Sequence, residues 1–355
     1  MQQDYIDKNL SVEKTIHKDG LMFYNVKEPP FDLYGFYSAN KNELFKRLPD
    51  NIARQTSQRV ATLYTNTSGG RVRFGTDSKK IAIIAKFPDV CYKPHMPLTC
   101  VMGFDLYSCN NSTYSYVKTF IPPFDTISGY ESYYEFPDAK MRDLTLNFPL
   151  YNNVSELYIG IDDKCSIYPG KHYSNTKPVV YYGSSITQGA CASRPGNCYA
   201  NILMREFDID FINLGFAGSA KGEECISKYI ADMEMSCFVL DYDYNTPSPE
   251  HLQNTHEAMF LKVREKHPQL PIVIMSSPDT IFADENQKRR DIIKQTYVNA
   301  IKRHDNNVYL IDGSTMFGAF GNDYTVDGIH PNDFGFRKMA DSVAEIFKII
   351  FNKDW

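Results

Sequence analysis

The sequence of 355 residues predicts two domains of different class: an antiparallel, jelly-roll-like β-sandwich, followed by an α/β domain with a parallel sheet. The chain is longer than one hydrophobic core usually holds. Its first half contains short β-type segments separated by turn residues, and its second half alternates apolar strands with helical segments. We therefore expect a sandwich over residues 1–170, a linker over 171–177 and the α/β domain over 178–355.

The strands of the first half are marked by runs rich in β-branched and aromatic side chains. Residues 71–78, 80–86 and 156–161 are such runs. Gly69-Gly70 is a turn signal directly ahead of the first of them. No long helical pattern interrupts this half, and the runs recur at intervals typical of a sandwich, so we expect antiparallel pairing.

The second half has a different pattern. A polar, turn-rich stretch at residues 168–178 separates it from the first half, and we interpret this stretch as the linker. Alternating buried strands and helices predict a doubly wound parallel sheet, in which ligands bind at the carboxyl ends of the strands. Strands are expected at 179–182, 210–214, 237–242, 271–275 and 308–312, and helices at 249–266, 287–304 and 336–351.

Composition excludes several classes of partner. A net charge of −5 gives no electrostatic reason to expect a nucleic acid or an anionic membrane as partner. No apolar run approaches the length that spans a bilayer. The first residues lack the regions of a secretory signal, so we expect a cytoplasmic protein, although a secreted chain without its signal would look the same. The eight cysteines form no Cys-x-x-Cys pair and are expected to be reduced thiols rather than zinc ligands.

Near the C-terminus, Asp327 precedes His330 by three residues in a loop of turn-forming residues. An imidazole that acts as a general base needs a partner that fixes its tautomer and stabilises its protonated form. The spacing lets the Asp327 carboxylate reach Nδ1 of His330, which leaves Nε2 free for a nucleophile. Asp and His also meet in surface turns and metal sites, so the pair alone does not establish a function.

Four other candidate residues follow three successive predicted strands. Ser184 and Ser185 follow the first strand, where a hydroxyl can stand above the sheet beside backbone N–H groups, and the spacing does not choose between them. Gly218 lies beyond the second strand and can offer an unhindered N–H. Asn245 lies beyond the third and can offer its side-chain amide. Each of these residues is also an ordinary turn or cap residue when taken alone.

Taken in order, these residues resemble the sequence blocks of the SGNH (GDSL-like) hydrolase superfamily. Gly183-Ser184-Ser185-Ile186 is similar to the first block, with Ser184 where the family name has Asp, and this match selects Ser185 as the nucleophile. Gly218 resembles the second block. Asn245 resembles the third, although Tyr244-Asn245 departs from the usual Gly-x-Asn-Asp.

The last block and the first half of the chain extend the resemblance. Asp327 and His330 match the fifth block of the superfamily. Residues 103–107, Gly-Phe-Asp-Leu-Tyr, resemble the Gly-x-Asp-Leu-Tyr signature of a β-sandwich that precedes a subset of these hydrolases, and residues 149–152 and 193–196 are similar to that subset too. The resemblance therefore spans nearly the whole chain and implies a three-layer α/β/α domain after the sandwich.

The resemblance implies a serine esterase that needs no metal and no organic cofactor. Ser185 would attack an ester carbonyl, His330 would be the general base and Asp327 its partner. The N–H groups of Ser185 and Gly218 and the amide of Asn245 would bind the oxyanion. Other families of the superfamily suggest a short acyl group, often acetyl, on a carbohydrate hydroxyl. The partner would then be a small-molecule or oligosaccharide ester.

Three further residues are candidates for substrate binding. Asp279 follows the fourth predicted strand, and a turn or cap role is its alternative. Arg194 can bind a substrate hydroxyl or carboxylate, or make structural hydrogen bonds. Tyr107 can contact a sugar, although Asp105 and Tyr107 fit a domain-interface role better. Five histidines without matching partners are interpreted as surface or structural residues: His172, His251, His256, His267 and His304.

Two alternative functions remain open at the level of sequence. An acyltransferase would use the same triad and pass the acyl group to an alcohol instead of water. A carbohydrate-binding protein with a vestigial triad is the second alternative, and the presence of Ser185, Asp327 and His330 argues against it. A homo-oligomer is possible, and the sequence does not determine the oligomeric state.

Overall fold

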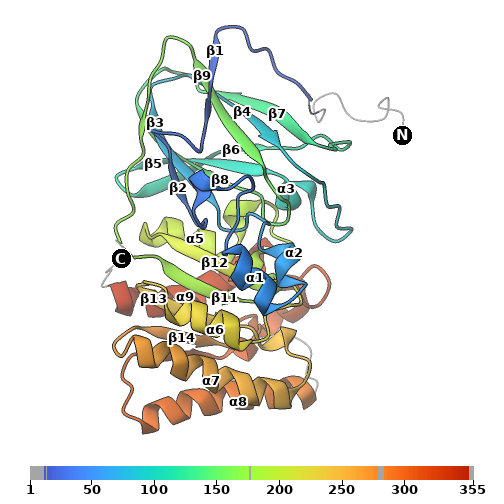
Figure 1. Cartoon of the computed structure of the whole chain (residues 1–355), viewed down its shortest axis with the longest axis vertical. Helices are drawn as coiled ribbons and strands as arrows, with labels where there is room; N and C mark the ends of the chain where they lie inside the picture. Colours follow the sequence, from blue (N-terminus) through green and yellow to red (C-terminus); the bar gives the residue numbers. More distant parts are fainter. Residues whose placement is uncertain (1–11, 13, 176, 279–283, 352–355) are drawn as a thin grey trace.

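The computed structural model describes residues 12, 14–175, 177–278 and 284–351. The first half of the chain forms two antiparallel sheets at one end of the molecule, and the second half forms a parallel sheet with helices at the other end (Figure 1). Both predicted fold classes are confirmed. Residues from both halves of the chain therefore line the boundary between the sandwich and the parallel sheet.

The sandwich consists of two sheets whose strands pair antiparallel throughout. The first has the order β1 (Leu21–Asn25), β9 (Glu156–Asp162), β4 (Lys80–Lys86) and β7 (Gly129–Glu135). The second has the order β10 (Ile167–Pro169), β3 (Arg71–Thr76), β8 (Arg142–Asn147), β5 (Phe104–Asn110) and β6 (Thr113–Phe120), with β2 (Asp32–Tyr34) paired to β3. The three runs predicted as strands are β3, β4 and β9.

The register of β4 and β9 follows from the alternation of their side chains. Ile81 and Ile83 of β4 lie opposite Ile161 and Ile159 of β9, and all four side chains are fully buried. Because side chains alternate between the two faces of a sheet, a slip by one residue would expose this whole set. Burying one such side chain contributes about 1.5–3 kcal/mol, so the pattern fixes the register strongly.

Short helices connect the strands of the first half: η3 (Ala39–Lys41), α1 (Asp50–Thr56), α2 (Val60–Leu63) and α3 (Leu98–Val101). Two of them, α1 and α2, lie beside the parallel sheet in Figure 1. Ala53 and Leu63 belong to the same buried cluster as Val180 and Leu214 of the α/β domain. Sequence periodicity did not predict these helices, because three to seven residues are too few to display a helical pattern.

The parallel sheet has the order β12 (Phe211–Gly215), β11 (Val179–Gly183), β13 (Cys237–Asp241), β14 (Ile272–Met275) and β15 (Val308–Ile311). Its five strands coincide with the predicted ones to within a residue or two. The connecting segments are α4 (Ser185–Gln188), η4 (Pro195–Asn197), α5 (Tyr199–Phe207), α6 (Glu224–Ala231), η5 (Asp243–Asn245), α7 (Pro249–Lys266), α8 (Asp284–Lys302), η6 (Gly313–Thr315), η7 (Gly318–Tyr324) and α9 (Asp333–Phe351).

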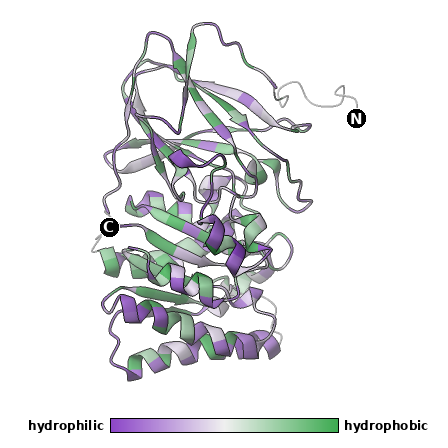
Figure 2. Cartoon of the chain, viewed as in Figure 1, coloured by the Kyte–Doolittle hydropathy of each residue, from purple (hydrophilic) through white to green (hydrophobic). Residues whose placement is uncertain are grey.

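Helices cover both faces of this sheet. Leu203 of α5 and Met339 of α9 belong to one buried cluster, which continues into the sandwich. Ile226 of α6, Phe260 of α7 and Ile293 of α8 belong to a second cluster on the opposite face. In Figure 2, hydrophobic residues are prominent on the strands of this sheet, and the helices beside it carry both hydrophobic and hydrophilic residues. The three-layer α/β/α arrangement is therefore present.

Two buried arginines of the first half close the open edge of the parallel sheet. Strand β12 pairs with β11 alone, which leaves the carbonyl groups of alternate residues pointing away from the sheet. Arg71 donates to the Phe211 carbonyl oxygen at 3.2 Å, and Arg47 donates to those of Asn213 and Gly215 at 2.9 and 2.7 Å. Because the guanidinium forks satisfy these acceptors, the edge strand needs no further strand beside it.

The segment between the two halves also packs closely. Tyr173 is buried, and its hydroxyl accepts a hydrogen bond of 3.0 Å from Nε of Arg71. The Ser174 N–H donates to the Asp208 carbonyl oxygen at 2.9 Å. These contacts hold Tyr173 against β3 of the sandwich and Ser174 against the α/β domain. The eight cysteines are free thiols, and no helix in the described part of the chain is long and apolar enough to cross a bilayer.

We expect Arg47→Met to lower the stability of the whole chain. The substitution leaves the carbonyl oxygens of Asn66, Asn213 and Gly215 buried without their donor, while that of Leu63 keeps the Asn66 N–H at 3.0 Å. Each unsatisfied buried acceptor costs about 1–3 kcal/mol, so a loss of several kcal/mol is expected. The thermal unfolding midpoint measures it, with Arg54→Met on the exposed side of α1 as the matched control. Equal midpoints for the two variants would contradict this account of the sheet edge.

Candidate active site

A cavity of about 490 Å³ opens between the two halves of the chain, at the carboxyl ends of β11, β12 and β13. Doubly wound sheets bind ligands at this edge, where the strand order reverses, and the reversal here lies at β11. The α/β domain lines the cavity with Ser185, Ala217, Gly218, Asn245 and His330. The first half of the chain contributes, among others, Arg59, Asn66, Asp89, Lys93, His95 and Tyr151.

The two adjacent serines after β11 have different environments. Ser184 is buried, and its Oγ accepts a hydrogen bond of 3.1 Å from the Ile186 N–H, so it caps helix α4. Ser185 lines the cavity, and its Oγ lies 2.9 Å from Nε2 of His330. Gly183 makes this turn possible, because a Cβ there would lie 2.1 Å from the Asp241 carbonyl oxygen. The geometry therefore distinguishes two serines that spacing left equivalent.

Asp327 and His330 are held together by their own loop. Nδ1 of His330 lies 2.7 Å from Oδ2 of Asp327, while Oδ1 accepts the N–H groups of Ile329 and His330 at 3.1 and 2.8 Å. Burial raises the pKa of Asp327, but the hydrogen bonds from His330 and Ile329 outweigh it and hold the pKa below its ordinary value. The ionised carboxylate can only accept, so Nδ1 donates and Nε2 is left with the lone pair that faces Ser185.

Hydrogen-bond donors surround the space next to Ser185. Gly218 lies in a turn closed by the Ser219 N–H and the Phe216 carbonyl oxygen, and its φ of +67° suits glycine. Nδ2 of Asn245 donates to the Phe216 carbonyl oxygen at 3.1 Å, which leaves its second hydrogen available. Among the described residues, the backbone N–H groups of Ser185 and Gly218 have no acceptor. Three donors are thus available at one side of the cavity.

Side chains from both halves of the chain position these donors. Oε1 of Gln188 accepts from the Ala217 N–H at 3.0 Å, beside Gly218. Nε2 of the same side chain donates to Oδ1 of Asn66 and to the Leu150 carbonyl oxygen, both at 3.2 Å. No pattern in the sequence marks Gln188, because its role depends on partners 38 and 122 residues away.

A buried carboxyl group supports helix α4 from below. Oδ2 of Asp241, at the end of β13, accepts from Thr187 Oγ1 at 2.9 Å and from the Tyr199 hydroxyl at 3.2 Å. Burial, together with the nearby Asp243 carboxyl, raises the pKa of Asp241 to about 8. The raised pKa favours the protonated, neutral form of the carboxyl group near neutral pH.

Two of the candidate substrate-binding residues lie away from the cavity. Arg194 donates to Oδ2 of Asp105 at 2.7 Å and to the Tyr107 hydroxyl, at the boundary between the sandwich and the α/β domain. The Gly196 N–H also donates to Oδ2 of Asp105, at 2.8 Å. Arg194 and Tyr107 thus have structural partners and do not line the cavity that contains Ser185. Asp279, the third candidate, lies outside the described residues.

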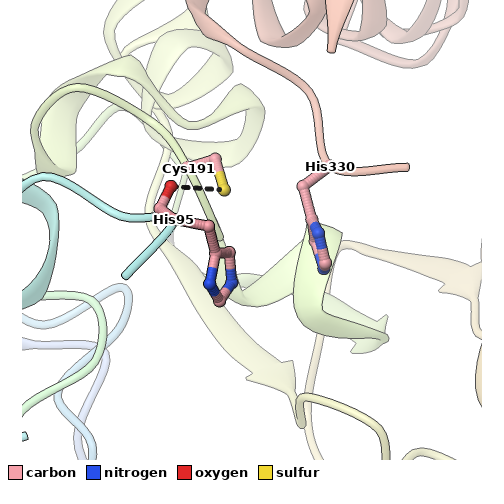
Figure 3. Close-up of side chains that lie close together, drawn as sticks. All are labelled: His95, Cys191 and His330. Carbon is pink, nitrogen blue, oxygen red and sulfur yellow. Dashed lines mark hydrogen bonds between the residues drawn. The ribbon is translucent and has the colours of Figure 1, made fainter. Parts of the chain in front are cut away.

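His95 is a residue of the cavity that sequence reasoning missed. It lies in the loop between β4 and α3, and its ring centroid is 5.6 Å from that of His330. The Sγ of Cys191 donates to the His95 carbonyl oxygen at 3.4 Å (Figure 3). Burial raises the pKa of the Cys191 thiol to about 12. No pattern in the sequence connects residues 95, 191 and 330, so only the fold brings them together.

The five histidines interpreted as surface or structural residues do not line this cavity. His172 pairs with the Tyr34 hydroxyl at 3.1 Å, and His256 pairs with Thr296 Oγ1 at 2.9 Å. A second cavity, of about 560 Å³, lies between β6 and helices α5 and α9. It is lined by Arg337 and Glu206, which pair with each other, and it contains none of the predicted catalytic residues.

Comparison with known families agrees with this architecture. Residues 176–348 match the model of the GDSL-like lipase/acylhydrolase family. Residues 21–167 match the model of the GxDLY domain, described as the N-terminus of SGNH-hydrolase-type esterases. No curated protein sequence matches the chain.

Solved structures show the same two-part arrangement. A protein from Bacteroides ovatus described as a GDSL-like lipase is 27% identical, with a TM-score of 0.85 over 94% of this chain and 99% of that one. The salicylyl-acyltransferase SsfX3 of a tetracycline biosynthetic pathway is 20% identical, with a TM-score of 0.74 over 94% and 98% of the two chains. A family two carbohydrate esterase from Cellvibrio japonicus is 10% identical, with a TM-score of 0.60 over 94% and 98%. At such identities the last two structures support the fold alone.

We expect Asp241→Asn to change the pH dependence of stability. The pKa of Asp241 is raised to about 8 in the folded chain and is near 3.9 when the chain is unfolded. The contribution of Asp241 to the free energy of unfolding is therefore fully present below pH 4 and is lost as the pH rises towards 8. Asparagine does not titrate and keeps an acceptor for Thr187 and Tyr199. The free energy of unfolding of the variant, minus that of the native chain, should increase by about 1.4 kcal/mol per pH unit in this window.

Thermal midpoints measured between pH 5 and 9 test this expectation, with Asp163→Asn at an exposed position as the control. A difference between Asp241→Asn and the native chain that stays constant over this range would show that Asp241 is not held neutral.

Proposed function

We propose that this chain, which belongs to the GDSL-like lipase/acylhydrolase family, is a serine esterase with Ser185, His330 and Asp327 as its catalytic triad. The observation that carries the proposal is the hydrogen-bond chain from Ser185 Oγ to His330 Nε2, at 2.9 Å, and from His330 Nδ1 to Asp327 Oδ2, at 2.7 Å. These distances lie within the range that proton transfer requires. The proposed substrates are short acyl esters, above all acetyl esters, of a carbohydrate or a related small molecule.

The triad would act in two steps. In the first, His330 Nε2 takes the hydroxyl proton of Ser185 while Oγ forms a bond to the carbonyl carbon, and the resulting tetrahedral intermediate expels the alcohol. The leaving oxygen receives the proton back from His330. In the second step, water gives a proton to His330 as it attacks the acyl-serine, and His330 passes that proton to Ser185 Oγ as the acid leaves. Asp327 stays ionised throughout and stabilises the protonated imidazole.

The donors beside Ser185 would stabilise the negative charge on the carbonyl oxygen. These are the N–H groups of Ser185 and Gly218 and the second amide hydrogen of Asn245. They are held in place before the substrate arrives, Gly218 by its turn and Asn245 by its bond to the Phe216 carbonyl oxygen. Removing one such donor costs about 2.7–4 kcal/mol of transition-state stabilisation.

The cavity lining supports a polar substrate with a small acyl group. The cavity of about 490 Å³ falls in the usual range for small-molecule sites. Arg59 and Lys93 provide cationic donors in the lining, whereas the amides of Asn66, Asn152 and Asn153 are already engaged with protein partners. The fold shared with carbohydrate esterases, such as that of Cellvibrio japonicus, is consistent with this substrate class.

An acyltransferase is the second candidate. The same acyl-serine would react with an alcohol instead of water, and the cavity lies open between the two halves of the chain, where an acceptor can enter. The fold shared with the salicylyl-acyltransferase SsfX3 is compatible with it. Product analysis with p-nitrophenyl acetate and added glycerol separates the two: an esterase releases mainly acetate, whereas a transferase forms mainly acetylglycerol.

We expect Ser185→Ala to reduce the hydrolysis of p-nitrophenyl acetate by at least about a thousandfold, because the nucleophile is lost. Ser184→Ala is the matched control: it removes the cap of α4, costs about 0.5–2 kcal/mol of stability and retains most of the activity. Circular dichroism verifies that both variants fold. Undiminished activity in Ser185→Ala would refute the triad.

Asn245→Ala is expected to lower kcat by about 100–1,000-fold with little change in KM, since its amide binds the oxyanion and not the ground state. Gly218→Ala keeps its N–H, and a Cβ there meets no atom within 4 Å. Its loss of activity should be the smaller of the two and arise from the strain of a positive φ. The opposite order would exclude Asn245 as an oxyanion donor.

A further inference from the structure

Three potential metal ligands converge at the edge of the proposed active site. His95 comes from the loop between β4 and α3, Cys191 from the loop after α4, and His330 from the loop before α9. Figure 3 shows the rings of His95 and His330 side by side, with the sulfur of Cys191 beside the His95 backbone. One ligand atom of each residue lies within 4.8 Å of the other two.

These distances are close to those of a metal site. When three atoms lie within 4.8 Å of one another, an ion between them can be placed at most about 2.8 Å from each. This limit is 4.8 Å divided by the square root of three. Zinc binds histidine nitrogen at about 2.0–2.1 Å and thiolate sulfur at about 2.3 Å. Each ligand must therefore move by less than about 1 Å. His95 can do so, since its side chain is exposed on a loop.

We propose that His95, Cys191 and His330 bind a single Zn²⁺ ion, and that the bound ion switches the enzyme off reversibly. Two imidazoles and a thiolate form a ligand set that suits Zn²⁺, whereas Mg²⁺ and Ca²⁺ prefer oxygen ligands. When the Zn–S bond forms, the thiol proton of Cys191 passes to solvent. Water fills the fourth coordination position.

The same contacts make the ion an inhibitor. Both ring nitrogens of His330 are already engaged, Nδ1 with Asp327 and Nε2 with Ser185. An ion on Nε2 takes the lone pair that must accept the serine proton, and an ion on Nδ1 displaces Asp327. Either position breaks the hydrogen-bond chain on which the proposed esterase activity rests. Binding of the ion itself does not depend on that activity.

Direct binding is tested on the full-length chain with Co²⁺, which takes zinc sites and has a thiolate-to-cobalt charge-transfer absorption in the near ultraviolet. We expect one ion per chain and this absorption in the native protein. Cys191→Ser should abolish the absorption, and His95→Gln should weaken Zn²⁺ binding in calorimetry by at least tenfold. Cys225→Ser and His17→Gln, which lie outside the cluster, are the matched controls and should behave like the native chain.

Cys191→Gly is a second variant in case Cys191→Ser does not fold. Glycine suits the φ of 72° that Cys191 adopts, and it also removes the thiol. The proposal is overturned if no ion binds, or if Cys191→Ser, Cys191→Gly and His95→Gln all bind it as tightly as the controls.

Inhibition is measured separately, as the Zn²⁺ concentration that halves the hydrolysis of p-nitrophenyl acetate. EDTA should restore the activity of the native chain, and His95→Gln should need at least ten times more Zn²⁺. Binding without inhibition would refute the switch and leave the site intact. A chain that lacks esterase activity but shows the cobalt–thiolate absorption would refute the proposed function and not the metal site.

Discussion

The hydrogen bonds from Arg47 and Arg71 to the edge of the parallel sheet are the interaction on which the rest of the molecule depends. A parallel sheet with an unpaired edge strand exposes a row of carbonyl groups, and here that row belongs to β12, directly ahead of the loop that contains Gly218. Arg71 has Asp210 as a counterion, but Arg47 has only carbonyl oxygens as hydrogen-bond partners among the described residues. A fully buried charge held in this way is costly to disturb, so the first half of the chain is fixed rigidly to the second.

This attachment explains why the proposed site belongs to both halves of the chain. Tyr151 of the first half donates its hydroxyl to the carbonyl oxygen of Ser185 at 3.1 Å, and Gln188 ties Asn66 to the loop of Gly218 through its own amide. Such second-layer contacts determine whether a nucleophile and its oxyanion donors keep their spacing, because errors of about 1 Å cost large factors in rate. The sandwich therefore acts as one wall of the site and as its frame.

Sequence reasoning predicted what depends on local patterns. Period-two and helical patterns identified the strands and the long helices. The order of candidate residues at strand ends and in the last loop identified a set that lines one cavity: Ser185, Gly218, Asn245 and His330. It could not predict Arg47, whose acceptors in β12 lie 166 and 168 residues away, nor the meeting of His95 with Cys191. The choice between Ser184 and Ser185 also lay beyond spacing, since it depends on which hydroxyl turns inwards to cap α4.

Hydrogen bonds at one residue anchor both the loop that contains His330 and the segment that contains Cys191. Asp333, the first residue of α9, accepts hydrogen bonds from the Ser193 N–H at 2.8 Å, from its hydroxyl at 2.6 Å and from Asn197 Nδ2 at 2.8 Å. Asp333 lies three residues after His330, and its partner Ser193 lies two residues after Cys191. Because these hydrogen bonds anchor both segments, His330 is held near Cys191 as well as near Ser185. A thiol beside the proposed general base is thus a geometric consequence of how the loop before α9 is anchored.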